Sequence, residues 1–195
     1  MISLNEYLTK LASEAPVPGG GSAALVVGAT GCSLIGMVAR ICAGSKKYES
    51  VHDLATWLIS ASDDLRVKML QLRERDEEAY EAAVAARGDK EAMQRALFDA
   101  AAVPLEGVQS ALAALQLCVN ALELNNANLI SDTGCAAEFA YASLIGCAYN
   151  VRINHKFMKD EELVAKQRTA LEDYESQGAA LLSTVREAVD ASLNK

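Results

Sequence analysis

Residues 16–43 of this chain read PVPGGGSAALVVGATGCSLIGMVARICA, with no charged side chain before Arg40. After the opening prolines and glycines, most residues favour or tolerate a helix, and Ser22 stands where an N-cap is expected. We therefore predict a helix from Ser22 to about Ala43 that is apolar on all sides. Such a helix is typical of a protein core, where its small glycine and alanine residues let neighbouring helices approach closely.

A membrane-spanning segment is the alternative interpretation of residues 16–39, because this uncharged stretch is long enough to cross a bilayer. Two features favour a soluble protein. The stretch opens with helix-breaking prolines and glycines, and Ala, Gly, Ser, Thr and Cys outnumber Leu, Ile and Phe. The chain also starts MISLNEYLTK, without the basic and apolar regions of a signal peptide. We expect no association with membranes.

Residues 50–87 form a second long helical stretch with one apolar face. The stripe on this face has the alternating four- and three-residue spacing of a coiled-coil seam. Its members are Val51, Ala55, Leu58, Ser62, Leu65, Met69, Leu72, Asp76, Ala79, Ala83 and Ala86.

The remaining sequence predicts further helices. A capping box of Ser3 and Glu6 starts a short first helix. Later helices are expected over residues 90–103, 104–124, 131–154 and 160–193, with Pro104 starting one of them and Ser131-Asp132 capping another. No stretch has a strand pattern. The expected fold is all-α, a single domain over residues 1–195, built as a bundle of long antiparallel helices and assembled as a dimer.

Composition narrows the classes of partner and cofactor. The net charge is −8 and no basic stripe is present, which argues against binding to nucleic acid. The five cysteines are odd in number and mostly lie in apolar helical contexts, so we expect them to be reduced and buried in a cytoplasmic protein. The chain has only two histidines and no CxxC or HxxxH pair, so we expect no metal site.

The run Gly19-Gly20-Gly21-Ser22 is a candidate binding loop. Glycines let a ligand approach the backbone, and the free N–H groups at a helix start favour an anion or a carbonyl oxygen. No GK[ST] follows, so the run is not a phosphate-binding P-loop. A tight turn between two helices explains the same residues equally well.

Asp76 is the candidate acid or base, because it falls on the apolar stripe. A carboxyl group in such a place either finds a partner or has a raised pKa, and both are typical of acid–base sites. Arg73 and Tyr80 lie within reach on the same helix. The alternative is that position 76 has turned away from the core, so that the carboxylate is solvated among its charged neighbours.

Further polar residues are candidates for holding a substrate. Lys46 and Lys47 follow the apolar helix and could hold carboxylates, although an ordinary solvated turn explains them as well. Asparagines within an apolar helix want hydrogen-bond partners, and Asn150 and Asn154 share one helix face. Asn128 and Asp132 lie at the start of that helix. Asp132 and Asn150 are roughly 27 Å apart along it, so a site using both must be long or shared between subunits.

Several short motifs are spread over nearly the whole chain. They are Ala15–Ala24, Met37-Val38, Gly44–Tyr48, Asp76 with Glu78-Ala79-Tyr80, Val103–Leu105, and Asn128-Leu-Ile-Ser-Asp132. Together they resemble the formiminotransferase-cyclodeaminase C-terminal family. That family includes the cyclodeaminase domain of a bifunctional folate enzyme and stand-alone bacterial methenyltetrahydrofolate cyclohydrolases.

The resemblance implies an all-α dimer with a groove for its substrate, a tetrahydrofolate derivative. It implies Asp76 as the catalytic residue, Gly19–Ser22 as the lining of the groove, and Lys46 and Lys47 as partners of folate carboxylates, including those of polyglutamate tails. Asn128, Asp132, Asn150 and Asn154 match polar positions of the family and are expected to bind substrate.

Two activities fit the resemblance equally. A cyclodeaminase converts 5-formimidoyltetrahydrofolate to 5,10-methenyltetrahydrofolate and releases ammonia, whereas a cyclohydrolase interconverts the 5,10-methenyl and 10-formyl forms. Both act at the carbon between N5 and N10 and both need proton transfer. A non-catalytic folate-binding or adaptor bundle is the remaining alternative.

Overall fold

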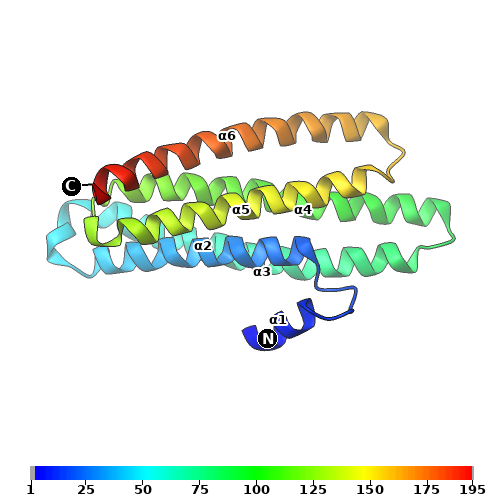
Figure 1. Cartoon of the computed structure of the whole chain (residues 1–195), viewed down its shortest axis with the longest axis horizontal. Helices are drawn as coiled ribbons and strands as arrows, with labels where there is room; N and C mark the ends of the chain where they lie inside the picture. The colour runs from blue at the N-terminus through cyan, green and yellow to red at the C-terminus, as the bar shows by residue number, and fades with distance from the viewer. Residues whose placement is uncertain (1–2, 195) are drawn as a thin grey trace.

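A computed structural model describes residues 3–194 and shows an elongated bundle of helices (Figure 1). The described residues contain no strand, which confirms the all-α prediction. The elements are α1 (Leu4–Leu11), α2 (Gly20–Ala43), the 3₁₀ helix η1 (Lys46–Val51), α3 (His52–Ala85), α4 (Lys90–Leu122), the 3₁₀ helix η2 (Ala127–Leu129), α5 (Ile130–His155) and α6 (Glu161–Leu193).

Helices α2 to α6 run up and down in chain order, each antiparallel to the one before it (Figure 1). Four of them form a closed ring, because α2 packs on α3 and α5, and α4 packs on the same two helices. Helix α6 covers α4 and α5 on one side, and a loop joins α1 to the start of α2. The beginnings of α2 and α4 therefore meet the ends of α3 and α5 at one end of the bundle.

The core is built largely from small side chains, as expected from the sequence. Fully buried alanines and cysteines alternate with leucines such as Leu25, Leu58 and Leu144. Gly31 shows why small residues are needed, since a Cβ added there would lie 2.9 Å from the carbonyl oxygen of Ala136. Helices α2 and α5 thus approach more closely than a side chain at position 31 would allow.

Helices α2 and α4 are each long and apolar enough to cross a membrane by length and composition. In each case 56% of the apolar window is buried inside the bundle. Both helices have other helices packed against them, as the core helices of a bundle do.

The structure corrects the prediction of two helices on either side of Pro104. Helix α4 is continuous from Lys90 to Leu122, with Pro104 buried in its interior. Proline lacks the N–H that would bond the carbonyl four residues earlier, which here belongs to Ala100. That carbonyl instead accepts a hydrogen bond from Asn154 Nδ2, at 2.8 Å. A side chain from α5 thus supplies the donor that α4 lacks.

Two predicted caps are also wrong. Helix α2 starts at Gly20 with Gly19 as its N-cap, so Ser22 lies inside the first turn. Helix α5 starts at Ile130 after Leu129, so Ser131 and Asp132 are already helical. Both helices begin earlier because Gly20, Gly21 and Ile130 are already helical, and neither N-cap residue makes a side-chain hydrogen bond.

Two other local predictions agree with the structure, except for the burial of one cysteine. The capping box of Ser3 and Glu6 is present at the start of α1. All five cysteines are free, as expected, and four of them are buried. Cys135 is exposed, because it lies on the side of α5 that faces away from the core.

Candidate active site

A pocket of about 620 Å³ opens at the end of the bundle where α2 begins. The segment before α2, the ends of α3 and α5 and the start of α4 all line it. Six residues predicted from the sequence are brought together here, namely Gly19, Gly20, Gly21, Asp76, Asn150 and Asn154. They come from three separate helices and from the loop, so only the tertiary structure joins them.

The glycine run brings the backbone of α2 against the pocket. A Cβ added at Gly21 would lie 2.6 Å from Asp76 Oδ2, a separation that no ordinary contact allows. The carboxyl group of Asp76 therefore packs directly on the α2 backbone. The N-cap Gly19 provides no side-chain hydrogen bond, and the Ser22 amide bonds Asp76, so the N–H groups of Gly20 and Gly21 are the ones left for an anion or oxygen atom in the pocket.

Asp76 is the acidic group of this pocket, and its pKa is raised to about 6. Burial is the main cause, because it disfavours the charged carboxylate. The backbone amide of Ser22 lowers the pKa and the charge of Glu77 raises it further. Arg73, one of the two partners suggested by the sequence, pairs with Glu74 and Glu77 instead. Asp76 therefore titrates near neutral pH, as a general acid or base should.

The two predicted asparagines lie together on α5, beside the glycine run. Asn150 Nδ2 donates to the carbonyl of Gly146, and Asn154 Nδ2 donates to the carbonyls of Ala100 and Asn150. Both N–H groups of Asn154 and one of the two of Asn150 are thus used within the protein. The Oδ1 atoms are what these side chains offer to a ligand, as acceptors for N–H or O–H groups.

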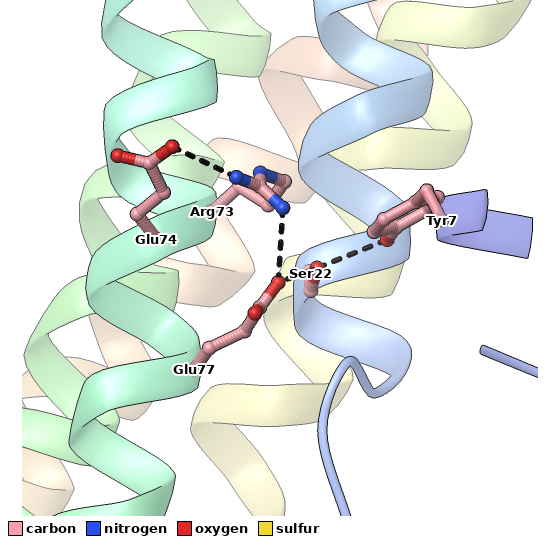
Figure 2. Close-up of polar contacts among 5 residues, drawn as sticks. All are labelled: Tyr7, Ser22, Arg73, Glu74 and Glu77. Atoms are coloured by element: carbon pink, nitrogen blue, oxygen red, sulfur yellow. Dashed lines mark hydrogen bonds and ion pairs between the residues drawn. The ribbon is translucent and has the colours of Figure 1, made fainter. Parts of the chain in front are cut away.

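Ser22 is not part of the pocket lining, although its neighbour Gly21 is, and its side chain joins a group of polar residues instead (Figure 2). It is fully buried, and its Oγ lies 2.9 Å from both Glu77 Oε1 and the hydroxyl of Tyr7. Arg73 bonds the same Glu77 from the other side. No sequence pattern marks Tyr7 or Glu77 as a site residue, since their roles depend on how α1 and α3 pack on α2.

The other four predicted residues lie at the opposite end of the bundle. Lys46 and Lys47 are in η1, Asn128 is in η2 and Asp132 is in the first turn of α5. Helix α2, which connects the two ends, has 24 residues and is therefore roughly 36 Å long. Within one chain these residues and Asp76 do not form one site.

The pocket contains further residues that the sequence did not reveal. Its apolar walls include Met93, Leu97, Ile153 and Phe157, and Arg87 adds a positive charge. Tyr80, which the sequence offered as a partner of Asp76, also lines the pocket. Arg87 comes just before Gly88, whose φ of 99° ends the α3 segment. The signal for these residues is weak, because apolar residues near helix ends occur in every bundle.

Comparison with known proteins assigns the chain to a family. Residues 3–173 match the model of the formiminotransferase-cyclodeaminase family. A methenyltetrahydrofolate cyclohydrolase of Methylorubrum extorquens is 33% identical over 203 residues, which cover 98% of each chain. The formimidoyltransferase-cyclodeaminase of Rattus norvegicus is 25% identical over 94% of this chain, which spans 37% of that longer protein.

A solved structure agrees with both the fold and the sequence matches. The crystal structure of a formiminotetrahydrofolate cyclodeaminase from Thermotoga maritima superposes with a TM-score of 0.94 and is 31% identical. The match covers 98% of each chain, so it includes the elements that line the pocket. The resemblance inferred from short motifs is confirmed, and this chain belongs to the formiminotransferase-cyclodeaminase family.

Proposed function

We propose that this chain is a folate enzyme that acts on the carbon between N5 and N10 of tetrahydrofolate. The substrate is either 5-formimidoyltetrahydrofolate or 5,10-methenyltetrahydrofolate, as the names of its full-length relatives suggest. The observation that carries the proposal is Asp76, a largely buried carboxyl with a pKa of about 6 on the wall of a mainly apolar pocket. A reaction that moves protons at nitrogen and water needs such a group.

Asp76 acts twice in either reaction. In the cyclohydrolase direction, ionised Asp76 takes a proton from the water that adds to the methenyl carbon and gives it to N5 as the N5–carbon bond breaks. The proton of the new hydroxyl group passes to solvent as the formyl C=O forms. In the cyclodeaminase reaction, which starts from the protonated formimidoyl group, it takes the proton from N10 as N10 attacks the formimidoyl carbon. It then gives that proton to the departing amino group, which leaves as ammonia. Both sequences return Asp76 to its ionised form. Activity should therefore fall below about pH 6.

The other pocket residues orient the substrate. The apolar side chains Met93, Leu97 and Phe157 suit the flat faces of folate rings, while the Oδ1 atoms of Asn150 and Asn154 accept hydrogen bonds from ring N–H groups. The N–H groups of Gly20 and Gly21, at the uncapped start of α2, donate to the oxygen or negative charge that develops on the substrate.

A single spectroscopic assay tests the proposal. Methenyltetrahydrofolate absorbs in the near ultraviolet, so its loss reports cyclohydrolase activity and its formation from 5-formimidoyltetrahydrofolate reports cyclodeaminase activity. We expect at least one reaction to exceed the uncatalysed rate, and the ratio of the two rates identifies the physiological direction. Binding of both compounds without turnover would instead identify a non-catalytic folate-binding bundle.

We further propose a homodimer whose active sites are shared between subunits. The support is the separation of the predicted ligand groups, with Asp76 at one end of the bundle and Lys46 and Lys47 at the other. A folate with a polyglutamate tail carries several carboxylates, and Arg87 is the only basic side chain on the pocket wall within residues 3–194. Lysines of a partner subunit would supply the missing positive charge.

An apolar face suggests how the subunits meet. Helices α2 and α5 lie side by side (Figure 1). Each of them exposes large apolar side chains along its length. These are Val27, Met37 and Ile41 on α2, and Phe139, Tyr149 and Ile153 on α5. If the two-fold axis is perpendicular to the helices, the α2 helices of the two subunits are antiparallel. The η1 end of one subunit then covers the pocket end of the other.

We also propose a cytoplasmic location, without membrane or nucleic-acid partners and without a metal cofactor. Five free cysteines support the cytoplasmic location, and a net charge of −8 argues against nucleic acid. Recovery of the whole protein without detergent, and activity that survives treatment with a chelator, are the expected results.

A further inference from the structure

A buried polar network lies behind Asp76, and Figure 2 shows how its members meet. Ser22 Oγ donates to Glu77 Oε1 at 2.9 Å, and the hydroxyl of Tyr7 lies 2.9 Å from the same oxygen of Ser22. Since Ser22 has one hydroxyl proton and Glu77 accepts it, Tyr7 must donate to Ser22. The chain of donors runs from α1 through α2 and ends on a carboxylate of α3.

Arg73 completes the network. Its Nη1 lies 3.2 Å from Glu77 Oε1 and its Nη2 lies 2.8 Å from Glu74 Oε1, while the guanidinium group stands over the Tyr7 ring. The Arg73 and Glu77 side chains are 17% and 20% exposed, so their pairing is shielded from solvent. Arg73 sits three residues before Asp76 and would be its natural partner on a helix. Glu77 keeps it away.

Ser22 stands between two adjacent carboxyl groups of α3. Its backbone amide faces Asp76 and its side chain bonds Glu77. Gly21, the residue before it, lies directly against the Asp76 carboxyl. Any shift of Ser22 therefore moves the α2 backbone relative to Asp76.

We propose that Glu77 and Ser22 are positioning residues for Asp76, a role that rests on the function proposed above. Ser22 fixes the first turn of α2 against the Asp76 carboxyl. Glu77 holds Ser22 in place, occupies Arg73 and sets a negative charge next to Asp76. Together they keep Asp76 unpaired with a cation and ready to exchange protons near neutral pH.

The charged and titratable groups around Asp76 agree with this role. On its own helix they are Arg73, Glu77 and Tyr80. Tyr7 faces it from α1, Cys147 from α5, and Arg87 from the pocket rim. Burial raises the pKa of Cys147 to about 12, and the Asp76 charge adds to that rise, so this thiol stays neutral. Glu77 and Arg73 are therefore the neighbours whose charges can be changed to shift the titration of Asp76.

The test uses the full chain and compares the fall in activity at low pH among four proteins. In Glu77→Gln, a negative neighbour is lost and Arg73 is released, so the midpoint of the fall moves down by about one pH unit. In Arg73→Gln, a positive charge is lost and the midpoint moves up. The control Glu74→Gln removes the other partner of Arg73. The Glu74 side chain is 66% exposed, so this variant leaves the midpoint unchanged.

Opposite shifts in Glu77→Gln and Arg73→Gln are expected only if both residues act on Asp76 through charge, since mere loss of packing would affect both variants alike. Equal midpoints in all four proteins would overturn the proposal. Carboxyl titration of Asp76 by NMR gives the same comparison without activity. A wild-type protein inactive on both folates would refute the proposed function, while the NMR titration would still decide the role of Glu77.

Discussion

Asp76 is the residue at which burial, charge and the backbone of α2 meet. The Asp76→Asn variant keeps the shape of the side chain and removes its proton exchange. We expect kcat to fall on the order of 10²–10⁴-fold, the contribution typical of a general acid or base. The fall in activity below about pH 6 should disappear as well. Steady-state kinetics with either folate, with circular dichroism as the folding control, checks both points. A variant that keeps the wild-type pH profile would remove Asp76 from the mechanism.

The same substitution should stabilise the protein at neutral pH. The pKa of Asp76 is raised from 3.8 to about 6 in the folded state, so the folded protein binds the proton more tightly than the unfolded chain. The resulting stabilisation is complete below about pH 4 and is lost as the pH rises through 6. Asp76→Asn is free of this loss. Its free energy of unfolding should match wild type at pH 4 and exceed it by about 1 to 3 kcal/mol at pH 7. Urea unfolding at both pH values measures the difference, and a constant difference would contradict the raised pKa.

Gly21 and Gly20 form a matched pair for testing the packing of Asp76. A Cβ at Gly21 would lie 2.6 Å from Asp76 Oδ2, whereas at Gly20 the nearest side-chain atom is Asn150 Nδ2 at 3.7 Å. We expect Gly21→Ala to displace the carboxyl group and to lower kcat/KM about 100-fold. Gly20→Ala should keep its activity and gain slightly in stability, because alanine favours a helix. Equal activity in the two variants would show that Asp76 does not depend on the glycine.

At the scale of a whole element, α4 continues through Pro104 because α5 supplies a hydrogen bond. Asn154 Nδ2 donates to the carbonyl of Ala100, the group that the N–H of residue 104 would otherwise satisfy. Asn154 is therefore both a pocket residue and a structural partner of α4. The sequence marks Pro104 as a helix breaker and cannot indicate a donor that lies 50 residues further along the chain.

A double-mutant cycle tests this compensation. Asn154→Ala leaves the Ala100 carbonyl without its donor and should lower the free energy of unfolding by about 1 to 3 kcal/mol. Adding Pro104→Ala restores a backbone N–H at position 104, so the double variant should recover about 1 kcal/mol or more of that loss. Urea unfolding of the four proteins gives the coupling energy. Additive effects of the two substitutions would show that Asn154 does not compensate for the proline.

At the scale of the whole molecule, a shared active site has a numerical consequence. Asp76→Asn removes the catalytic group at one end of the bundle, and a Lys46→Glu, Lys47→Glu double variant changes the other end. In a mixed dimer one site carries both defects and the other carries neither. Random exchange makes half of the dimers mixed, so an inactive pair should recover about a quarter of wild-type activity.

The mixing experiment uses a polyglutamylated folate, because the lysines are proposed to hold its tail. Analytical ultracentrifugation of each variant confirms that dimers form before and after mixing. Activity that stays at the mean of the two separate variants would place each site within a single chain and contradict the shared arrangement.

The sequence by itself determined the helical class, most helix boundaries, and the residue that stands out on the α3 stripe. These depend on local spacing of apolar residues and on turn-forming glycines, which a single stretch of chain contains. Its short motifs also sufficed to indicate the family.

Only the tertiary structure decided which candidates share a pocket. Gly21, Asp76 and Asn150 meet because three helix ends converge, whereas Lys46 and Asp132 lie at the far end. The network behind Asp76 and the bond from Asn154 to α4 were equally hidden in the sequence. Such contacts join residues that are dozens of positions apart, and the periodicity that predicts a helix does not specify what its side chains meet across the core.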